Sequence, residues 1–405
     1  MRRYVVGGAV LLCLFIVLGW FAFHEERPPL DQLPVTVEPA KPPAQQAAPA
    51  FEPPDDLSSE QPTNRLAVSA STNAAVIYRQ AFELFDMLSK EQKAIVRDWQ
   101  TNVGASVEAE LCEKTRPICD LMHQASAVTN CDWGIEPISY DTKFPHLQAS
   151  RNIARAAIWN ALHCRSSDVT GATDDAVSVI RLGQQVSRSA IIGCLVDMAL
   201  QGVASSYVTQ NVGLFRGADS QRLVAAFDEP AYEEAPSRAM EQEAGIMERL
   251  AAHLASLSPD ELQKELSSLS DETTGATFNL DRTTALAQLQ QVVDSDRELA
   301  KALASSSDDD YEAWLRHRTE LQELNPLAKI FLAALDRFVD KARTAEVNRA
   351  MVVAGLAVAE NGTEALAAHL DPASGKPFQY TETDAGFELQ STFVVNDKPY
   401  KVRFK

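Results

Sequence analysis

Five cysteines follow the apolar opening of this chain, and closely spaced thiols can form disulfides or bind metals. They are Cys112, Cys119, Cys131, Cys164 and Cys194. On one continuous helix, Cys112 and Cys119 would lie about 10 Å apart, too far for a bond. Pro117 should break such a helix, because proline removes a backbone donor. The sequence therefore predicts a closed loop in which Cys112 and Cys119 can form a disulfide; the alternative is that this pair stays reduced.

A second group combines thiol, indole and imidazole side chains: Cys131, Trp133, His146 and His163. They lack the short paired spacing of zinc ligands, so we expect no metal and no cofactor. The sequence motifs of serine hydrolases, zinc peptidases, phosphate-binding loops and dinucleotide-binding folds are also absent. We therefore assign no catalytic residue. If the protein has a groove with reactive groups, these four residues are the candidates to line it.

The N-terminus predicts a membrane anchor. Arg2 and Arg3 precede an uncharged apolar run, Tyr4–Phe23, which as a helix would span roughly 30 Å, the thickness of the hydrocarbon core of a bilayer. Positive charge stays in the cytoplasm, so residues 1–3 form a cytoplasmic stub and the bulk of the chain is exported. A cleaved signal peptide is the competing interpretation, but the run is long and lacks a small-residue cleavage pattern. We expect a single-pass protein of a bacterial inner membrane with a periplasmic domain.

Residues 24–65 form a predicted spacer. They contain ten of the 20 prolines, mixed with alanine, glutamine and acidic residues. Such a segment cannot bury enough apolar surface to offset its ordering entropy, so we expect it to be disordered. The whole chain carries 37 basic and 56 acidic side chains, a net charge of −19. This potential repels phosphate backbones, which argues against nucleic acid as a partner.

Residues 66–370 show helical periodicity and helix start signals. Ser89 and Gln92 have the spacing of a capping box, and Ser258, Pro259 and Glu261 form a second helix start. The expected helices also include 73–88, 146–163, 174–187, 191–210, 280–304, 308–324 and 326–360. The pair 146–163 and 174–187 resembles a tetratricopeptide-type hairpin, but no 34-residue repeat recurs. We therefore predict a mainly α fold, an irregular bundle or short solenoid of hairpins.

Residues 371–405 change to the alternating pattern of strands. Apolar and polar residues alternate between turn signals at Asp384-Ala385-Gly386 and Asn396-Asp397-Lys398. This predicts a small antiparallel β-meander. Because three strands alone are marginally stable, the meander should pack on the last long helix.

The ending also resembles a known pattern. Asp371-Pro372, Gly375, Pro377 and Tyr380, followed by Gly386, Leu389 and Ser391, are similar to the endings of pseudopilins and of uncharacterised membrane-anchored bacterial envelope proteins. Three further parts of the chain are similar to the helical part of that uncharacterised group: Asn73–Phe82, Cys131-Asp132-Trp133-Gly134-Ile135 and the helices from His146 to Gln210. The pseudopilin processing site and calcium-loop aspartates have no counterpart here. The resemblance implies a helical domain with a meander, and no activity.

Two classes of function follow. The favoured one is a non-enzymatic interaction or scaffold protein, anchored through residues 4–23, that binds an envelope protein. The alternative is a periplasmic hydrolase of an envelope polymer whose site residues are dispersed along the chain. A groove with desolvated histidine or carboxylate groups would favour the enzyme.

Overall fold

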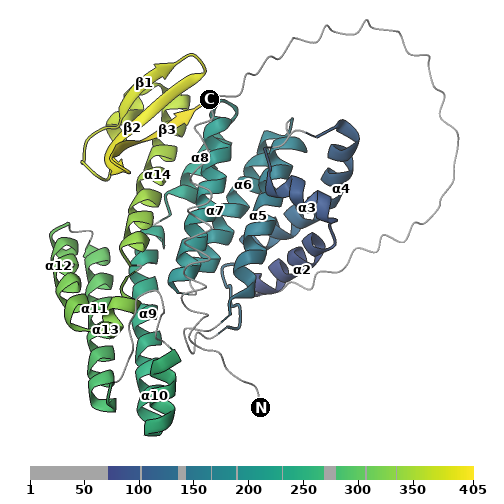
Figure 1. Cartoon of the computed structure of the whole chain (residues 1–405). Coiled ribbons are helices and arrows are strands. Elements are labelled where there is room, and N and C mark those ends of the chain that lie inside the picture. The colour runs from purple at the N-terminus through teal and green to yellow at the C-terminus, as the bar shows by residue number, and fades with distance from the viewer. Residues whose placement is uncertain are drawn as a thin grey trace, which may run out of the picture. The chain divides into compact units, whose positions relative to one another are not determined.

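The computed structural model describes residues 72–100, 103–135, 143–165, 167–187, 190–229, 231–268, 280–305, 308–333 and 335–405. The predicted stub at 1–3, anchor at 4–23 and spacer at 24–65 lie outside these residues. Figure 1 confirms the predicted fold class, which is mainly helical with a small antiparallel sheet at the C-terminal end.

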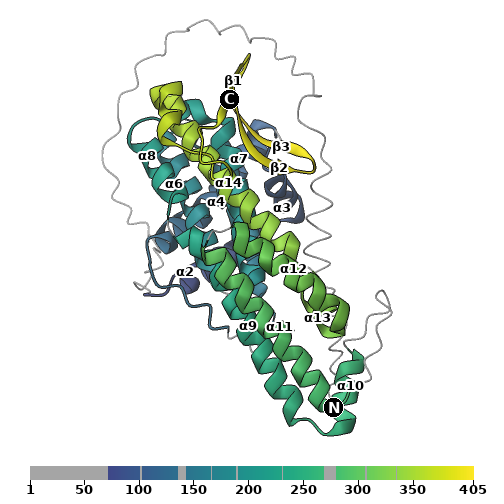
Figure 2. The same cartoon turned by 90° about the vertical axis from the view of Figure 1, so that its left-hand side faces the viewer.

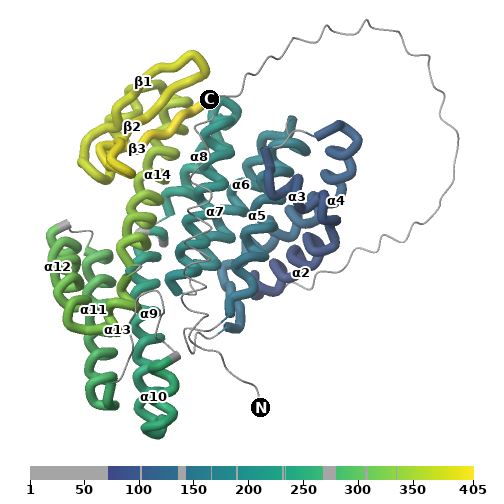
Figure 3. The backbone as a smooth tube through the Cα atoms, in the orientation of Figure 1, coloured from purple at the N-terminus to yellow at the C-terminus, as the bar shows by residue number. Residues whose placement is uncertain are grey.

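The first half of the described chain is a series of helices that pack on their neighbours. α4 contacts α2 and α5, α5 contacts α6, and α6 contacts α7, as the backbone trace in Figure 3 also shows. Their bounds are α2 (Ala74–Asp86), α3 (Lys90–Arg97), α4 (Ala105–Ser126), α5 (Pro145–His163), α6 (Val169–Val186) and α7 (Ile191–Gln210).

The second half contains a long helical pair and a long helix that reaches the sheet. α9 and α11 pack along each other, as Figures 1 and 2 both show, and α14 packs on α7 and α8. The bounds are α8 (Ala218–Phe227), α9 (Ala231–Ser256), α10 (Pro259–Ser268), α11 (Arg282–Ser305), α12 (Asp308–Leu324), α13 (Pro326–Phe331) and α14 (Leu335–Asn361), with 3₁₀ turns η3 (Val212–Leu214) and η4 (Thr363–Ala368).

Several helix starts follow from local hydrogen bonding. Ser89 accepts from the backbone N–H of Gln92, whose side chain accepts from the N–H of Ser89, so the predicted capping box is confirmed. α6 begins at Val169, earlier than the predicted 174, because Asp168 accepts from the N–H of Gly171 and caps the helix there. The predicted helix 326–360 is instead two helices, α13 and α14.

The sheet is the predicted meander. β1 (Gln379–Thr383), β2 (Gly386–Val395) and β3 (Lys398–Phe404) pair antiparallel in the order β1-β2-β3. Phe387 of β2 pairs with Phe404 of β3, and their rings stack with centroids 4.7 Å apart. The Phe404 ring is buried against Gly355 of α14, where a Cβ would lie 2.0 Å from the ring. The sheet thus packs on the helix that precedes it.

Candidate functional site

The disulfide joins Cys112 to Cys164, not to Cys119. The two Cα atoms lie 5.6 Å apart, within bonding range, and the bond links α4 to the end of α5. The predicted pairing was wrong because α4 continues through Pro117. Cys112 and Cys119 therefore lie two turns apart on one helix, about 10 Å, and Cys119 is a buried free thiol.

Cys119 borders a buried charged network around Asp175 that sequence reasoning missed. Asp175 is fully buried; its carboxylate lies 2.8 Å from Nε2 of His123 and 3.2 Å from Nε of Arg165. Asn160 donates to it at 2.6 Å. Burial, together with the nearby Asp175 carboxylate, raises the pKa of the Cys119 thiol well above its usual value. The thiol therefore stays protonated, and this network has the properties of a structural centre rather than a nucleophilic one.

The structure brings together three of the four residues predicted for a groove. The rings of Trp133 and His146 stack at 4.4 Å, and Trp133 also stacks on Tyr78 of α2 at 5.9 Å. Cys131 is buried and contributes to the raised pKa of the Tyr78 phenol, whose largest cause is burial. Burial, and then the charge of Arg79, lower the pKa of His146 to about 4. These side chains fill the space among themselves, so the cluster is packed core.

His163 lies apart from that cluster. Its ring stacks on Trp159 at 4.7 Å, and its Nδ1 lies 3.6 Å from a carboxylate oxygen of Glu108. It directly precedes Cys164, so it belongs to the region around the disulfide. Among the described residues, no three His, Cys, Asp or Glu side chains converge in a way that could hold a metal ion.

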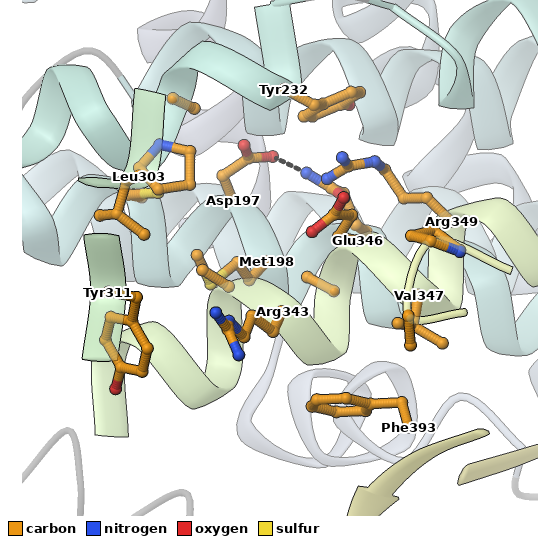
Figure 4. Close-up of a pocket in the computed structure, with 18 of the residues that line it drawn as sticks. Asp197, Met198, Tyr232, Leu303, Tyr311, Arg343, Glu346, Val347, Arg349 and Phe393 are labelled. Carbon is orange, nitrogen blue, oxygen red and sulfur yellow. Dashed lines mark hydrogen bonds between the residues drawn. The ribbon is translucent and has the colours of Figure 1, made fainter. Parts of the chain in front are cut away.

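A cavity of about 540 Å³ lies elsewhere, between the helices and the sheet (Figure 4). Its walls come from α7, α9, α11, α12, α14, β2 and the loop after Leu370. The lining residues on which the site depends are Asp197, Met198, Gln201, Tyr232, Leu303, Tyr311, Arg343, Glu346, Arg349, Phe393 and Val394.

α7 supplies the polar floor of this cavity, although it is the most apolar helix described. Within the described residues it is the one helix long and apolar enough to cross a membrane, and 61% of its most apolar window is buried inside the structure. Such burial is also found for the core helix of a globular domain. α7 packs on α5, α6, α9 and α14, and Asp197 is its one charged residue.

Asp197 has an unusual environment for a carboxyl group. It is 1% exposed, and it accepts a hydrogen bond from Nε2 of Gln201 at 2.9 Å. It lies against α6 at Gly183, where a Cβ would be 2.3 Å from its oxygen. Burial raises its pKa to about 7, against the opposing effects of the Gln201 hydrogen bond and the Arg349 charge. This carboxyl therefore changes its charge near neutral pH.

Two arginines of α14 lie across aromatic rings at the cavity. Arg349 lies over the ring of Tyr232 at 4.7 Å, and Arg343 lies over the ring of Tyr311 at 4.6 Å. In Figure 4 the Arg349 side chain runs beneath Tyr232. The Tyr232 hydroxyl donates to the carbonyl of Ile180 at 3.2 Å, which holds the ring in place. The guanidinium groups are thus positioned by stacking.

Sequence reasoning missed this site because its residues come from positions 194–394 and from many elements. One signal was present: Asp197 is a single acid in an otherwise uncharged helix. A charge placed in an apolar helix is costly unless it has a partner or a role.

Comparison of the chain with protein-family models, with curated proteins and with solved structures finds no match.

Proposed function

We propose that this chain is a membrane-anchored binding protein of the bacterial envelope, whose cavity between α7, α9 and α14 takes a segment of another envelope protein. The cavity is the observation that carries the proposal. Its volume of about 540 Å³ lies within the range of about 300–1,000 Å³ typical of ligand sites. Polar and apolar side chains both line it.

The Cys112–Cys164 bond supports an exported location for this domain. Disulfides form and persist in oxidising compartments such as the bacterial periplasm, and are rare in the cytosol. An anchor at residues 4–23 with its N-terminus in the cytoplasm would place the domain in that compartment. The similarity of the Asp371–Ser391 ending to those of anchored envelope proteins agrees with this location.

A hydrolase acting on an envelope polymer is the second candidate. One observation favours it: the pKa of Asp197 is raised to about 7, where a general base is most effective. Among the described residues that line the cavity, no equally suited second group accompanies it. Burial raises the pKa of the Cys194 thiol, so it stays protonated, and Glu346 is exposed. Turnover of an envelope polymer by the full chain, lost in Asp197→Asn, would establish this candidate instead.

Site-specific photocrosslinking in living cells tests the binding proposal. A photoreactive residue at Val394, which lines the cavity and is 54% exposed, should give a discrete adduct with an envelope protein. The matched control is Met87 at the end of α2, which is 80% exposed and lies outside the cavity lining. Equal adducts from both positions, or none from Val394, would overturn the proposal.

A further inference from the structure

In the cavity, Arg349 forms no close ion pair with a carboxylate among the described residues, although its charge acts on nearby Asp197. Its interaction there is the stacking contact with Tyr232. Stacking uses the face of the guanidinium and leaves its in-plane N–H groups able to donate. Two parallel N–H groups match the two oxygens of a carboxylate, which makes this pairing both strong and directional.

Gln201 holds Asp197 at the floor of the cavity. Its side chain is 2% exposed and lines the cavity, and its Nε2 donates to Asp197. Its Oε1 is buried and has no hydrogen-bond partner within the described part of the chain, so it is out of reach of a ligand in the cavity.

We propose that the cavity binds the free carboxyl terminus of a peptide, with the terminal carboxylate on Arg349. This inference rests on the proposed function and names the chemistry that the partner must present. A peptide end presents its carboxylate next to the side chain of the terminal residue. Capture of terminal carboxylates is a recurring mode of peptide recognition.

The charges of the cavity favour a carboxylate over a phosphate. Arg349 lies near two acidic side chains, Asp197 and Glu346, which line the same cavity. Their negative charge opposes a doubly charged anion more strongly than a singly charged carboxylate.

The apolar wall provides a place for the side chain of the terminal residue. Met198, Leu303 and Phe393 line the cavity together with the polar floor. Figure 4 shows Leu303 to one side of Asp197, Met198 between Asp197 and Arg343, and Phe393 below the arginines. An apolar terminal residue would bury surface here, and this burial would add to the affinity.

Binding of a randomised peptide library to the full-length chain, reconstituted in a lipid bilayer, tests the inference. The library is prepared with a free C-terminal carboxylate, with a C-terminal amide, and with a terminal residue of D configuration. We expect the free acids to bind about tenfold to a hundredfold more tightly than the amides, as expected for a charge-assisted pair. The library with a D-configured terminal residue distinguishes the two sources of such a carboxylate, because the C-terminus of a protein has the L configuration and cell-wall peptides end in D residues.

Variants assign the effect to Arg349. Arg349→Met should remove the preference for acids over amides, and Arg349→Lys should keep part of it. Arg222→Met is the matched control, because Arg222 forms a surface ion pair with Asp174 and lies outside the cavity lining.

Equal binding of acids and amides by the unmodified protein would overturn the inference, and this comparison needs no variant to fold. Absence of binding by the free-acid library would also overturn it. If the Val394 adduct forms and the acid preference is missing, the proposed function stands and only the ligand chemistry is wrong. If free acids bind and the adduct is missing, the envelope partner is wrong and the cavity chemistry stands.

Discussion

Ser391 donates a hydrogen bond to Oδ1 of Asp371 at 2.9 Å. The first and last residues of the C-terminal pattern Asp371–Ser391 are therefore in direct contact. The backbone N–H and the hydroxyl of Thr392 both donate to Oδ2 at 2.9 Å, and the N–H of Ala373 donates to Oδ1 at 3.0 Å. Burial alone would raise the pKa of this carboxyl, but the hydrogen bonds outweigh it and the pKa is lowered. These hydrogen bonds therefore fix the loop after Leu370 to β2. The loop and the strand together form one wall of the cavity.

Asp371→Ala should lower the free energy of unfolding by about 2–4 kcal/mol, because several donors lose their acceptor. Ser391→Ala removes one donor and should cost about 1 kcal/mol. Since the pKa of Asp371 is below its ordinary value when folded, its contribution is present above about pH 4 and is lost as the pH falls further. Urea unfolding at several pH values measures this. An unchanged midpoint for Asp371→Ala would contradict it.

Gly355→Ala should destabilise the protein although alanine favours helix. The gain in helix propensity is about 1 kcal/mol, but the new Cβ would lie 2.0 Å from the buried Phe404 ring. We expect a net loss of about 1–3 kcal/mol from overpacking. Gly202→Ala in α7 is the control, because a Cβ there meets no atom within 4 Å; it should be neutral or stabilising. Thermal unfolding of both variants compares them directly.

Removal of the Cys112–Cys164 bond should cost about 4 kcal/mol on the chain-entropy model, given the sequence separation of 52 residues. Cys112→Ser and the double variant with Cys164→Ser should be destabilised equally, because either change breaks the same bond. Mass spectrometry of the non-reduced exported protein should find the peptides of Cys112 and Cys164 linked. A linked peptide that contains Cys119 would refute this pairing.

Asp197→Asn should stabilise the protein at pH 8 and have little effect near pH 4. Because burial raises the pKa of Asp197 to about 7, the stabilising protonated form is fully present below about pH 4 and is lost as the pH rises through 7. This rise of about three pKa units corresponds to a loss of roughly 4 kcal/mol at most in the free energy of unfolding. The charged and titratable groups that line the cavity with Asp197 are Arg349 and Glu346 on α14, Tyr232 on α9 and Cys194 on α7, while α6 presents Gly183. Denaturation curves between pH 4 and 8 measure the difference, and parallel curves for both proteins would contradict it.

His146→Phe should protect the protein against acid. The pKa of His146 is lowered to about 4 by burial and by Arg79, so its neutral form stabilises the fold and stability is lost as the pH falls below about 6.5. Phenylalanine can keep the stacking on Trp133 and cannot be protonated. We expect a gain of about 1–3 kcal/mol at pH 5 and a smaller change at pH 8. This pH dependence runs opposite to that of Asp197, so the two variants separate the two groups.

Local signals in the sequence were sufficient for much of the fold. The capping box at Ser89, the helix Ile191–Gln210 and the meander all follow from spacing over a few residues. The continuity of α4 through Pro117 could not be predicted from such local signals. Pro117 costs one backbone hydrogen bond, but Ile118 and Met122, which follow it in the helix, are fully buried, and this burial keeps the helix continuous. No local rule could weigh those two effects.

The cavity was beyond sequence reasoning for a different reason. Arg349 and Tyr232 are far apart in the chain, and their stacking depends on how α9 and α14 are placed. The cluster of Trp133 and His146 could be anticipated as a set, but its character could not, because ring packing rather than an open groove surrounds it. Asp197 was visible as a lone charge, and only its three-dimensional surroundings show why it is tolerated.

The position of Asp175 affects how cooperatively α4, α5 and α6 unfold. Its carboxylate receives partners from α4 through His123, from α5 through Asn160 and from the connection to α6 through Arg165. An intermediate with only two of these segments docked would hold a desolvated anion with part of its solvation shell missing, and would therefore be scarcely populated. The amide hydrogens of α4, α5 and α6 should accordingly exchange with solvent through one shared opening event rather than helix by helix.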